Sequence, residues 1–221
     1  MARLPRLVLP GHAHYVIQRG LAGQPAFADD VDRHRYLDHL AEAAALHRVT
    51  LHAWALLPHE VQLLLTPVEA TGLSLCLQAV GRRYVSAYNR RHARKGTLWD
   101  GRYRAGVVEP GALRLTVLAM IDGLSSAPGW SSAAQRLGGE HDATLVDPPE
   151  FWALGNTPFD REAAYRQHLA APATQTTAAA LRRAALGGWP VASPAFASAL
   201  GAEIGRPSRP RTAGRPRRPL P

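Results

Sequence analysis

Residues 49–67 read VTLHAWALLPHEVQLLLTP and contain two apolar runs with the period of a β-strand. In the run 49–57 every second residue is apolar, and in the run 60–66 Val61, Leu63 and Leu65 share one face. Only Pro58 and His59 separate the two runs. Because strands joined by so short a connection pair with each other, the stretch predicts an antiparallel β-hairpin.

The segments on either side of this hairpin alternate between strand and helix patterns. Residues 13–19 are rich in β-branched and aromatic types and indicate a first strand, and Asp29 and Asp30 are suited to cap an amphipathic helix that runs to about residue 47. After the hairpin we expect a helix from Thr71 to about residue 95, a strand over 102–109 and a helix over 111–124. The order strand, helix, strand, strand, helix, strand predicts a ferredoxin-like α+β domain with an antiparallel sheet.

Beyond residue 125 the composition shifts to Ser, Ala, Gly and Pro. Short helices are expected at about 160–170 and 195–203, and residues 172–180 are expected to form a polar, Ala-rich linker. The last segment is rich in Arg and Pro, which favours disorder until it binds a partner. We therefore predict a domain over 1–125, a small, mostly helical extension over 126–203 and a disordered basic tail over 204–221.

The overall composition points to a polyanionic partner. The 221 residues carry 26 Lys and Arg, of which only Lys95 is a lysine, against 17 carboxylates, for a formal net charge of +9. The single Cys76 excludes an internal disulfide. No apolar run approaches the roughly 20 residues needed to span a bilayer, and the N-terminus lacks a secretory pattern. We expect no membrane association and a location in the bacterial cytoplasm, at the nucleoid.

The charge is concentrated in two segments, the basic block over 82–104 and the tail. Tyr and Trp alternate with the cations of the basic block, as they do on surfaces that neutralise phosphates and stack unpaired bases, although a solvated face is the alternative. In the tail, Gly-Arg-Pro triplets indicate either minor-groove hooks or non-specific electrostatic contacts. The predicted DNA-binding residues are Arg19, Arg82, Arg83, Arg90, Arg91, Arg94, Lys95, Arg102, Arg104, Arg206, Arg215 and Arg217.

Several motifs resemble those of the REP-associated tyrosine transposases, which are single-tyrosine HUH transposases. They include the strand end Gln18-Arg19-Gly20, the segment 57–67, the blocks 81–91 and 96–104, and the C-terminal stretch 181–189. The resemblance implies an HUH domain in which two His at alternate positions of the second hairpin strand hold a divalent metal. It further implies a nucleophilic Tyr on the third helix, and a partner that is hairpin or single-stranded DNA at repeated palindromes.

The chain departs from this family at its catalytic positions. Glu60 and Gln62 stand where the two His are expected, and Met120 stands where the Tyr is expected, which leaves no catalytic residue at these positions. Glu60 and Gln62 are a degenerate metal pair whose oxygens suit Mg²⁺ or Mn²⁺. His59 points to the opposite sheet face, and the His12-Ala13-His14 spelling is interpreted as a chance match.

These substitutions predict a DNA-binding protein that is deficient in cleavage and is either a monomer or a homodimer. One alternative is an active transposase, a nucleotidyltransferase that uses Glu60 and Gln62 for metal and a relocated Tyr. Tyr84, Tyr88 and Tyr103 lie close to the basic block, but core packing or base stacking is the favoured role for them. A second alternative is a decaying transposase remnant that folds without a present role.

Overall fold

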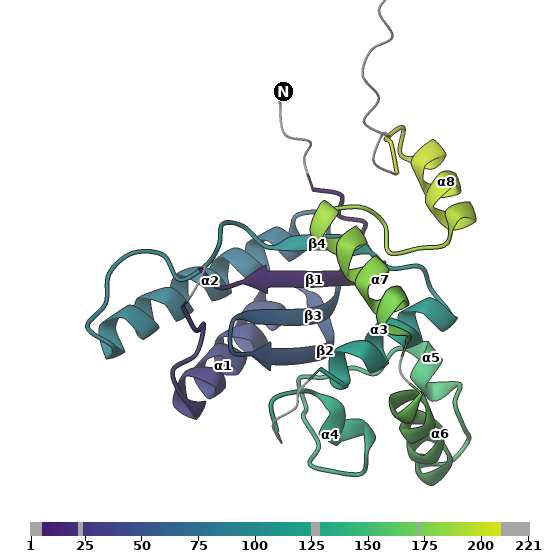
Figure 1. Cartoon of the computed structure of the whole chain (residues 1–221), viewed down its shortest axis with the longest axis horizontal. Helices are drawn as coiled ribbons and strands as arrows, with labels where there is room; N and C mark the ends of the chain where they lie inside the picture. Colours follow the sequence, from purple (N-terminus) through teal and green to yellow (C-terminus); the bar gives the residue numbers. More distant parts are fainter. Residues whose placement is uncertain (1–5, 22–23, 125–128, 172, 209–221) are drawn as a thin grey trace, which may run out of the picture.

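A four-stranded sheet forms the centre of the protein (Figure 1). The computed structural model describes residues 6–21, 24–124, 129–171 and 173–208. All neighbouring strands are antiparallel, and the predicted hairpin is confirmed, with Leu57 paired to Glu60 beside the turn. The strands lie in the order β2-β3-β1-β4, with bounds β1 (His14–Arg19), β2 (Val49–Leu57), β3 (Glu60–Pro67) and β4 (Arg104–Val107).

Two long helices, α1 (Asp30–Leu46) and α2 (Gly72–Arg91), cover one face of this sheet and enclose a first hydrophobic core with it (Figure 1). The element order β1-α1-β2-β3-α2-β4, combined with a sheet in which β3 lies between β1 and β2, is the ferredoxin-like arrangement. The α+β fold class predicted from the sequence is confirmed.

The ends of these two helices follow from local chemistry. Asp29 caps α1 as predicted, because its side chain accepts a hydrogen bond from the backbone N–H of Asp32 at 3.1 Å. α2 ends at Arg91, earlier than the predicted end near residue 95. The left-handed backbone of Ala93, with φ of 49°, is incompatible with a continued α-helix and explains the earlier stop.

The opposite sheet face is covered by α3 (Ala112–Asp122) and α7 (Gln175–Gly187), which enclose a second core (Figure 1). α7 lies against β4, where a side chain at Gly106 would collide with the backbone carbonyl of Trp189. The chain after α7 then joins the edge of β4, since Val191 N–H donates to the carbonyl of Val107 at 2.7 Å. The C-terminal half therefore helps to build the layer that covers the sheet.

The expectation of a linker over 172–180 is wrong for residues 175–180, which form the first half of α7. Thr174 caps this helix by accepting a hydrogen bond from the backbone N–H of Thr177 at 3.2 Å. An Ala-rich composition occurs both in linkers and in helices, so it does not distinguish them. Here the packing of Leu181, Ala184 and Ala185 on the second core stabilises the helix.

The remaining helices are short, and a buried ion-pair network attaches two of them to α3. The Arg136 guanidinium is fully buried and lies 2.8 Å from Asp122 Oδ2 and 2.7 Å from Asp147 Oδ1, while the Tyr165 hydroxyl donates to Asp122 at 2.6 Å. Asp122, two residues after Met120, thus has a structural role. These helices are α4 (Ala133–Arg136), α5 (Pro149–Trp152), α6 (Pro158–Ala170) and α8 (Pro194–Glu203).

Some predictions concern segments outside the described residues. The proposed boundary between residues 125 and 126 falls in the undescribed stretch 125–128, and most of the basic tail, with Arg215 and Arg217, follows residue 208. None of the helices in the described ranges is both long and apolar enough to cross a membrane.

Candidate functional site

The two positions of the expected metal pair lie together on the sheet face that α3 and α7 cover. Strand β3 places Glu60 and Gln62 on one side because side chains alternate along a strand. Gln62 is 2% exposed, and its amide nitrogen donates to Glu60 Oε1 at 2.5 Å. On β1, the hydroxyl of Tyr15 donates a hydrogen bond to Gln62 Oε1. One oxygen of each member of the pair is therefore already occupied.

Arg182 on α7 completes this arrangement, which we call the Glu60 cluster (Tyr15, Glu60, Gln62 and Arg182). Its guanidinium donates two parallel hydrogen bonds to the Glu60 carboxylate, both at 2.6 Å. These bonds raise the pKa of Arg182 above its usual range, so the group is a permanent cation. The Glu60 side chain is 13% exposed and the Arg182 side chain 34%.

The Glu60 cluster does not fit a divalent metal ion. Both Glu60 oxygens and the Gln62 oxygen accept hydrogen bonds from neighbouring side chains. The Arg182 cation would repel Mg²⁺ or Mn²⁺ at the same carboxylate. Among the described residues there is no group of three His, Cys, Asp or Glu that suits a metal. Here an arginine occupies the side of the carboxylate that a metal would need.

The tyrosines lack the properties of a nucleophile. All six tyrosines of the chain are 7% exposed or less, and burial raises the pKa of each. Tyr84, Tyr88 and Tyr103 belong to the first core, on the sheet face opposite the Glu60 cluster. Tyr15 is itself a member of the Glu60 cluster, but its buried hydroxyl is hydrogen-bonded to Gln62. Met120 packs against the second core.

Of the predicted DNA-binding cations in the described ranges, all but Arg206, which follows α8, divide into two groups according to their partners. Four of them are paired with other residues of the chain. Arg19 pairs with Asp100 at 2.8 Å and Arg83 with Glu42 at 2.6 Å. Arg94 donates to Gln24, Asn89 and the Thr97 carbonyl.

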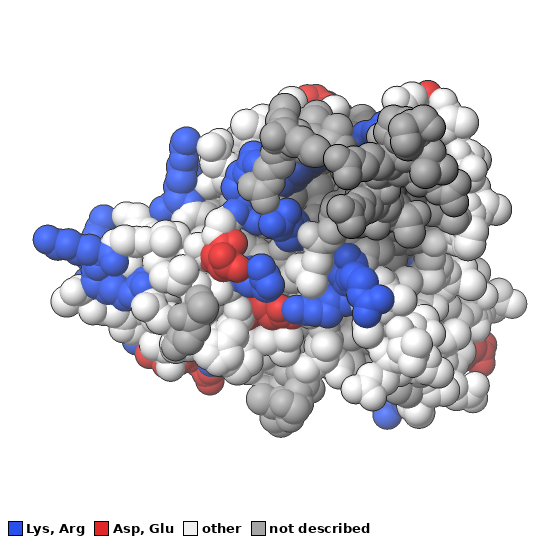
Figure 2. Space-filling view, turned by 45° about the horizontal axis from the view of Figure 1, so that its top comes forward, with Lys and Arg blue, Asp and Glu red and all other residues white. Residues whose placement is uncertain are grey.

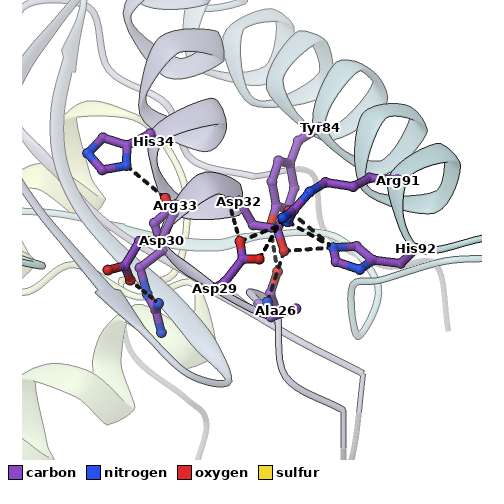
Figure 3. Close-up of polar contacts among 10 residues, drawn as sticks. Ala26, Asp29, Asp30, Asp32, Arg33, His34, Tyr84, Arg91 and His92 are labelled. Carbon is purple, nitrogen blue, oxygen red and sulfur yellow. Dashed lines mark hydrogen bonds and ion pairs between the residues drawn. The ribbon is translucent and has the colours of Figure 1, made fainter.

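Arg91 is the most firmly held member of the first group. Its guanidinium lies between Asp29 and Asp32, at 2.6 and 2.7 Å, with His92 against the second carboxylate (Figure 3). The hydrogen bonds from Arg91 lower the pKa of Asp29 to about 2. Arg91 thereby joins the end of α2 to the start of α1, and its charge is largely neutralised at that point.

The second group consists of five cations whose side chains form no hydrogen bond or ion pair with any residue in the described ranges. In Figure 2, Lys and Arg side chains gather at the left end of the molecule, where α2 ends, and across the middle of the face, with few carboxylates among them. The members of this group, which we call the unpaired cations, are Arg82, Arg90, Lys95, Arg102 and Arg104.

A cleft of about 420 Å³ lies beside the unpaired cations Arg82 and Arg102. Its lining includes Arg6, Gln18 and Tyr103. Sequence reasoning did not select Gln18 or Arg182 for any role. Gln18 carried a weak signal, because it is a polar residue at period two with Val16 on a buried strand face. The sequence gives no signal that Arg182 pairs with Glu60, since the two residues are 122 positions apart.

Comparison with known proteins finds two solved structures that are similar over part of this chain. No protein-family model and no curated protein matches the sequence. The structure of a REP-associated tyrosine transposase bound to a REP hairpin is similar with a TM-score of 0.47 and 10% identity, over 55% of this chain and 70% of that one. A proposed transposase from Deinococcus radiodurans is similar with a TM-score of 0.37 and 22% identity, over 57% of this chain and 97% of that one. Both TM-scores are below 0.5 and both identities are below 25%.

Proposed function

We propose that the protein binds hairpin or single-stranded DNA and does not cut it, as a cleavage-deficient relative of the REP-associated tyrosine transposases. The observation that carries the proposal is the contrast between two sites. The Glu60 cluster is closed by the Arg182 ion pair, whereas the unpaired cations form no ion pair with any described residue.

The binding half of the proposal rests on the charge that is left without a partner. Phosphates release condensed counterions when Lys or Arg neutralises them, and a cation that is already paired with a carboxylate contributes little to this release. The five unpaired cations all lie within residues 82–104. Outside this block and the tail, the chain is net acidic. A polyanion is therefore attracted to this block rather than to the molecule as a whole.

The cleavage half rests on what strand scission needs. Attack on a phosphodiester by a tyrosine requires an accessible phenolate and a group that neutralises the developing charge on the phosphate. The tyrosines of this chain are buried with raised pKa values, and the carboxylate at the expected metal position is paired with Arg182. These features support loss of the covalent step with retention of binding.

Purified protein incubated with labelled hairpin DNA and Mn²⁺ tests both halves in one reaction. We expect a retarded complex on a native gel, and neither a shortened strand nor a protein–DNA adduct on a denaturing gel. A shortened strand or a covalent adduct would overturn the cleavage half, and loss of the adduct in Tyr15→Phe would identify Tyr15 as the nucleophile. Absence of any complex at low salt would overturn the binding half and favour a remnant without a role.

A further inference from the structure

The cleft beside Arg82 and Arg102 has the size and the lining of a ligand-binding site. It lies among α2, the segment that leads into β4 and the end of β1. Its volume of about 420 Å³ falls in the range of small-molecule pockets, roughly 300–1,000 Å³. Leu75 and Leu77 contribute apolar surface, so the cleft combines an apolar wall with a cationic rim.

Gln18 provides an unused polar group in this cleft. The residue is only 7% exposed, and its Oε1 is buried with no hydrogen-bond partner among the described residues. Its amide nitrogen also donates to no described residue. A buried acceptor without a hydrogen bond is unfavourable, so a ligand that pairs with this carboxamide removes a penalty that the folded protein carries.

Tyr103 and Arg6 form a second wall. The Arg6 guanidinium lies over the Tyr103 ring, 4.2 Å from its centroid, and the Tyr103 hydroxyl lies 2.9 Å from Ser74 Oγ. These contacts hold the Tyr103 ring in place. The rim cations Arg82 and Arg102 are exposed and have no ion pair among described residues, which leaves their donors for a phosphate.

From this arrangement we propose that the cleft, which we call the Gln18 cleft, binds one unpaired nucleotide of the DNA. The base enters the cleft, where its edge pairs with the Gln18 carboxamide once a side-chain rotation turns the buried Oε1 towards the cleft, and the adjoining phosphate is bound by Arg82 and Arg102. A carboxamide offers a donor and an acceptor side by side, the pattern that adenine complements with both of its own groups. The inference rests on the proposed DNA binding and adds to it a specific subsite.

The test uses the full chain and a hairpin oligonucleotide with a single-stranded extension in which each nucleotide in turn is replaced by an abasic site. With the wild type we expect one abasic position to weaken binding about tenfold, since loss of a bound, hydrogen-bonded base is of that order. Gln18→Leu should weaken binding of the intact oligonucleotide by a similar factor and show no further loss at that abasic position. Gln167→Leu, at an exposed glutamine on α6, is the matched control and should bind as the wild type does.

Arg102→Gln at the exposed rim gives a second reading that does not depend on a buried substitution. We expect it to weaken binding several-fold with the natural phosphate, and to make no difference when the phosphate at the sensitive position is an uncharged methylphosphonate. Failure of the wild type to bind any oligonucleotide would overturn the proposed function itself. Tight binding in which no abasic position matters, or in which Gln18→Leu and Arg102→Gln both equal the wild type, would overturn only the subsite.

Discussion

His14 shows how a single buried residue makes the stability of this fold depend on pH. Its ring is fully buried at the start of β1. Nδ1 lies 2.8 Å from the carbonyl of His12, and Nε2 accepts a hydrogen bond from the backbone N–H of Leu9 at 3.2 Å. Only the neutral ring with its proton on Nδ1 satisfies both contacts. Burial lowers the pKa of His14 to about 4, because the charged ring is poorly solvated at this position.

We expect the free energy of unfolding to fall as the pH drops from about 6.5 towards 4. In this window the unfolded state binds a proton that the folded state excludes, so stability rises with pH and is fully present above the unfolded pKa of about 6.5. The contribution of His14 between pH 7 and pH 5 is roughly 2 kcal/mol. His52, whose pKa burial also lowers, acts in the same direction.

Urea unfolding at the two pH values measures this difference. His14→Gln removes the titrating group and should make the pH dependence of unfolding shallower, whatever it does to stability at pH 7. Identical pH dependence in the wild type and the variant would show that His14 is not the group responsible.

At the scale of elements, α7 determines what the second face of the sheet can do. It packs on β4 and β1, and through Arg182 it places a cation on the Glu60 carboxylate of β3. Neither partner of this pair is fully solvated, because the Glu60 side chain is 13% exposed and the Arg182 side chain 34%. Removing one partner leaves the other with an uncompensated charge at a site of reduced solvation.

Arg182→Ala should therefore destabilise the protein by about 2 kcal/mol, less than for a fully buried pair because water still reaches the guanidinium. The neighbouring Arg183 is exposed and has no ion pair among described residues, so Arg183→Ala should stay within about 0.5 kcal/mol of the wild type. The double variant Glu60→Leu, Arg182→Leu should recover much of the loss. Equal denaturation midpoints for Arg182→Ala and Arg183→Ala would contradict the role of the pair.

The same ion pair predicts how the protein responds to metal ions. Melting temperatures recorded with Mn²⁺, with Mg²⁺ and with EDTA should coincide, because a ligand stabilises a fold only when it binds the native state. A saturable rise in melting temperature with Mn²⁺, abolished by Glu60→Gln, would show that the carboxylate binds metal in spite of Arg182.

At the scale of the whole molecule, the net charge of +9 overstates the charge available to a partner. Several cations form ion pairs with carboxylates of the same chain. Arg83 pairs with Glu42, and Arg91 pairs with Asp29 and Asp32. The unpaired cations remain, and two of them flank the Gln18 cleft.

Salt titrations of DNA affinity should separate these two groups of arginines. Arg82→Ala combined with Arg102→Ala should reduce the slope of log affinity against log salt by about 1.4, as expected for two phosphate contacts on a single strand. Arg83→Ala removes a charge from the next position of the same helix and should leave the slope nearly unchanged. The measurement is fluorescence anisotropy over a series of KCl concentrations. A loss of slope in Arg83→Ala of about half that in the double variant, in proportion to one charge against two, would mean that charge alone, not position, governs binding.

Elements with local signals could be predicted from the amino-acid sequence. The hairpin over 49–67, the Asp29 cap and the apolar face of α2 could be predicted because strand period, capping and helical period act between residues close together in the chain. The same reasoning failed at 175–180, where local composition does not distinguish a linker from a helix.

Which charged residues are free to bind a partner depends on the folded arrangement. The sequence counts Arg82 and Arg83 as equivalent, but Arg83 meets Glu42 from another helix, 41 positions away. It shows Glu60 and Gln62 as altered ligands, and only the fold brings Arg182 to them across 122 positions. Such pairings depend on where the backbone carries each side chain in space, and no periodicity in the sequence encodes them.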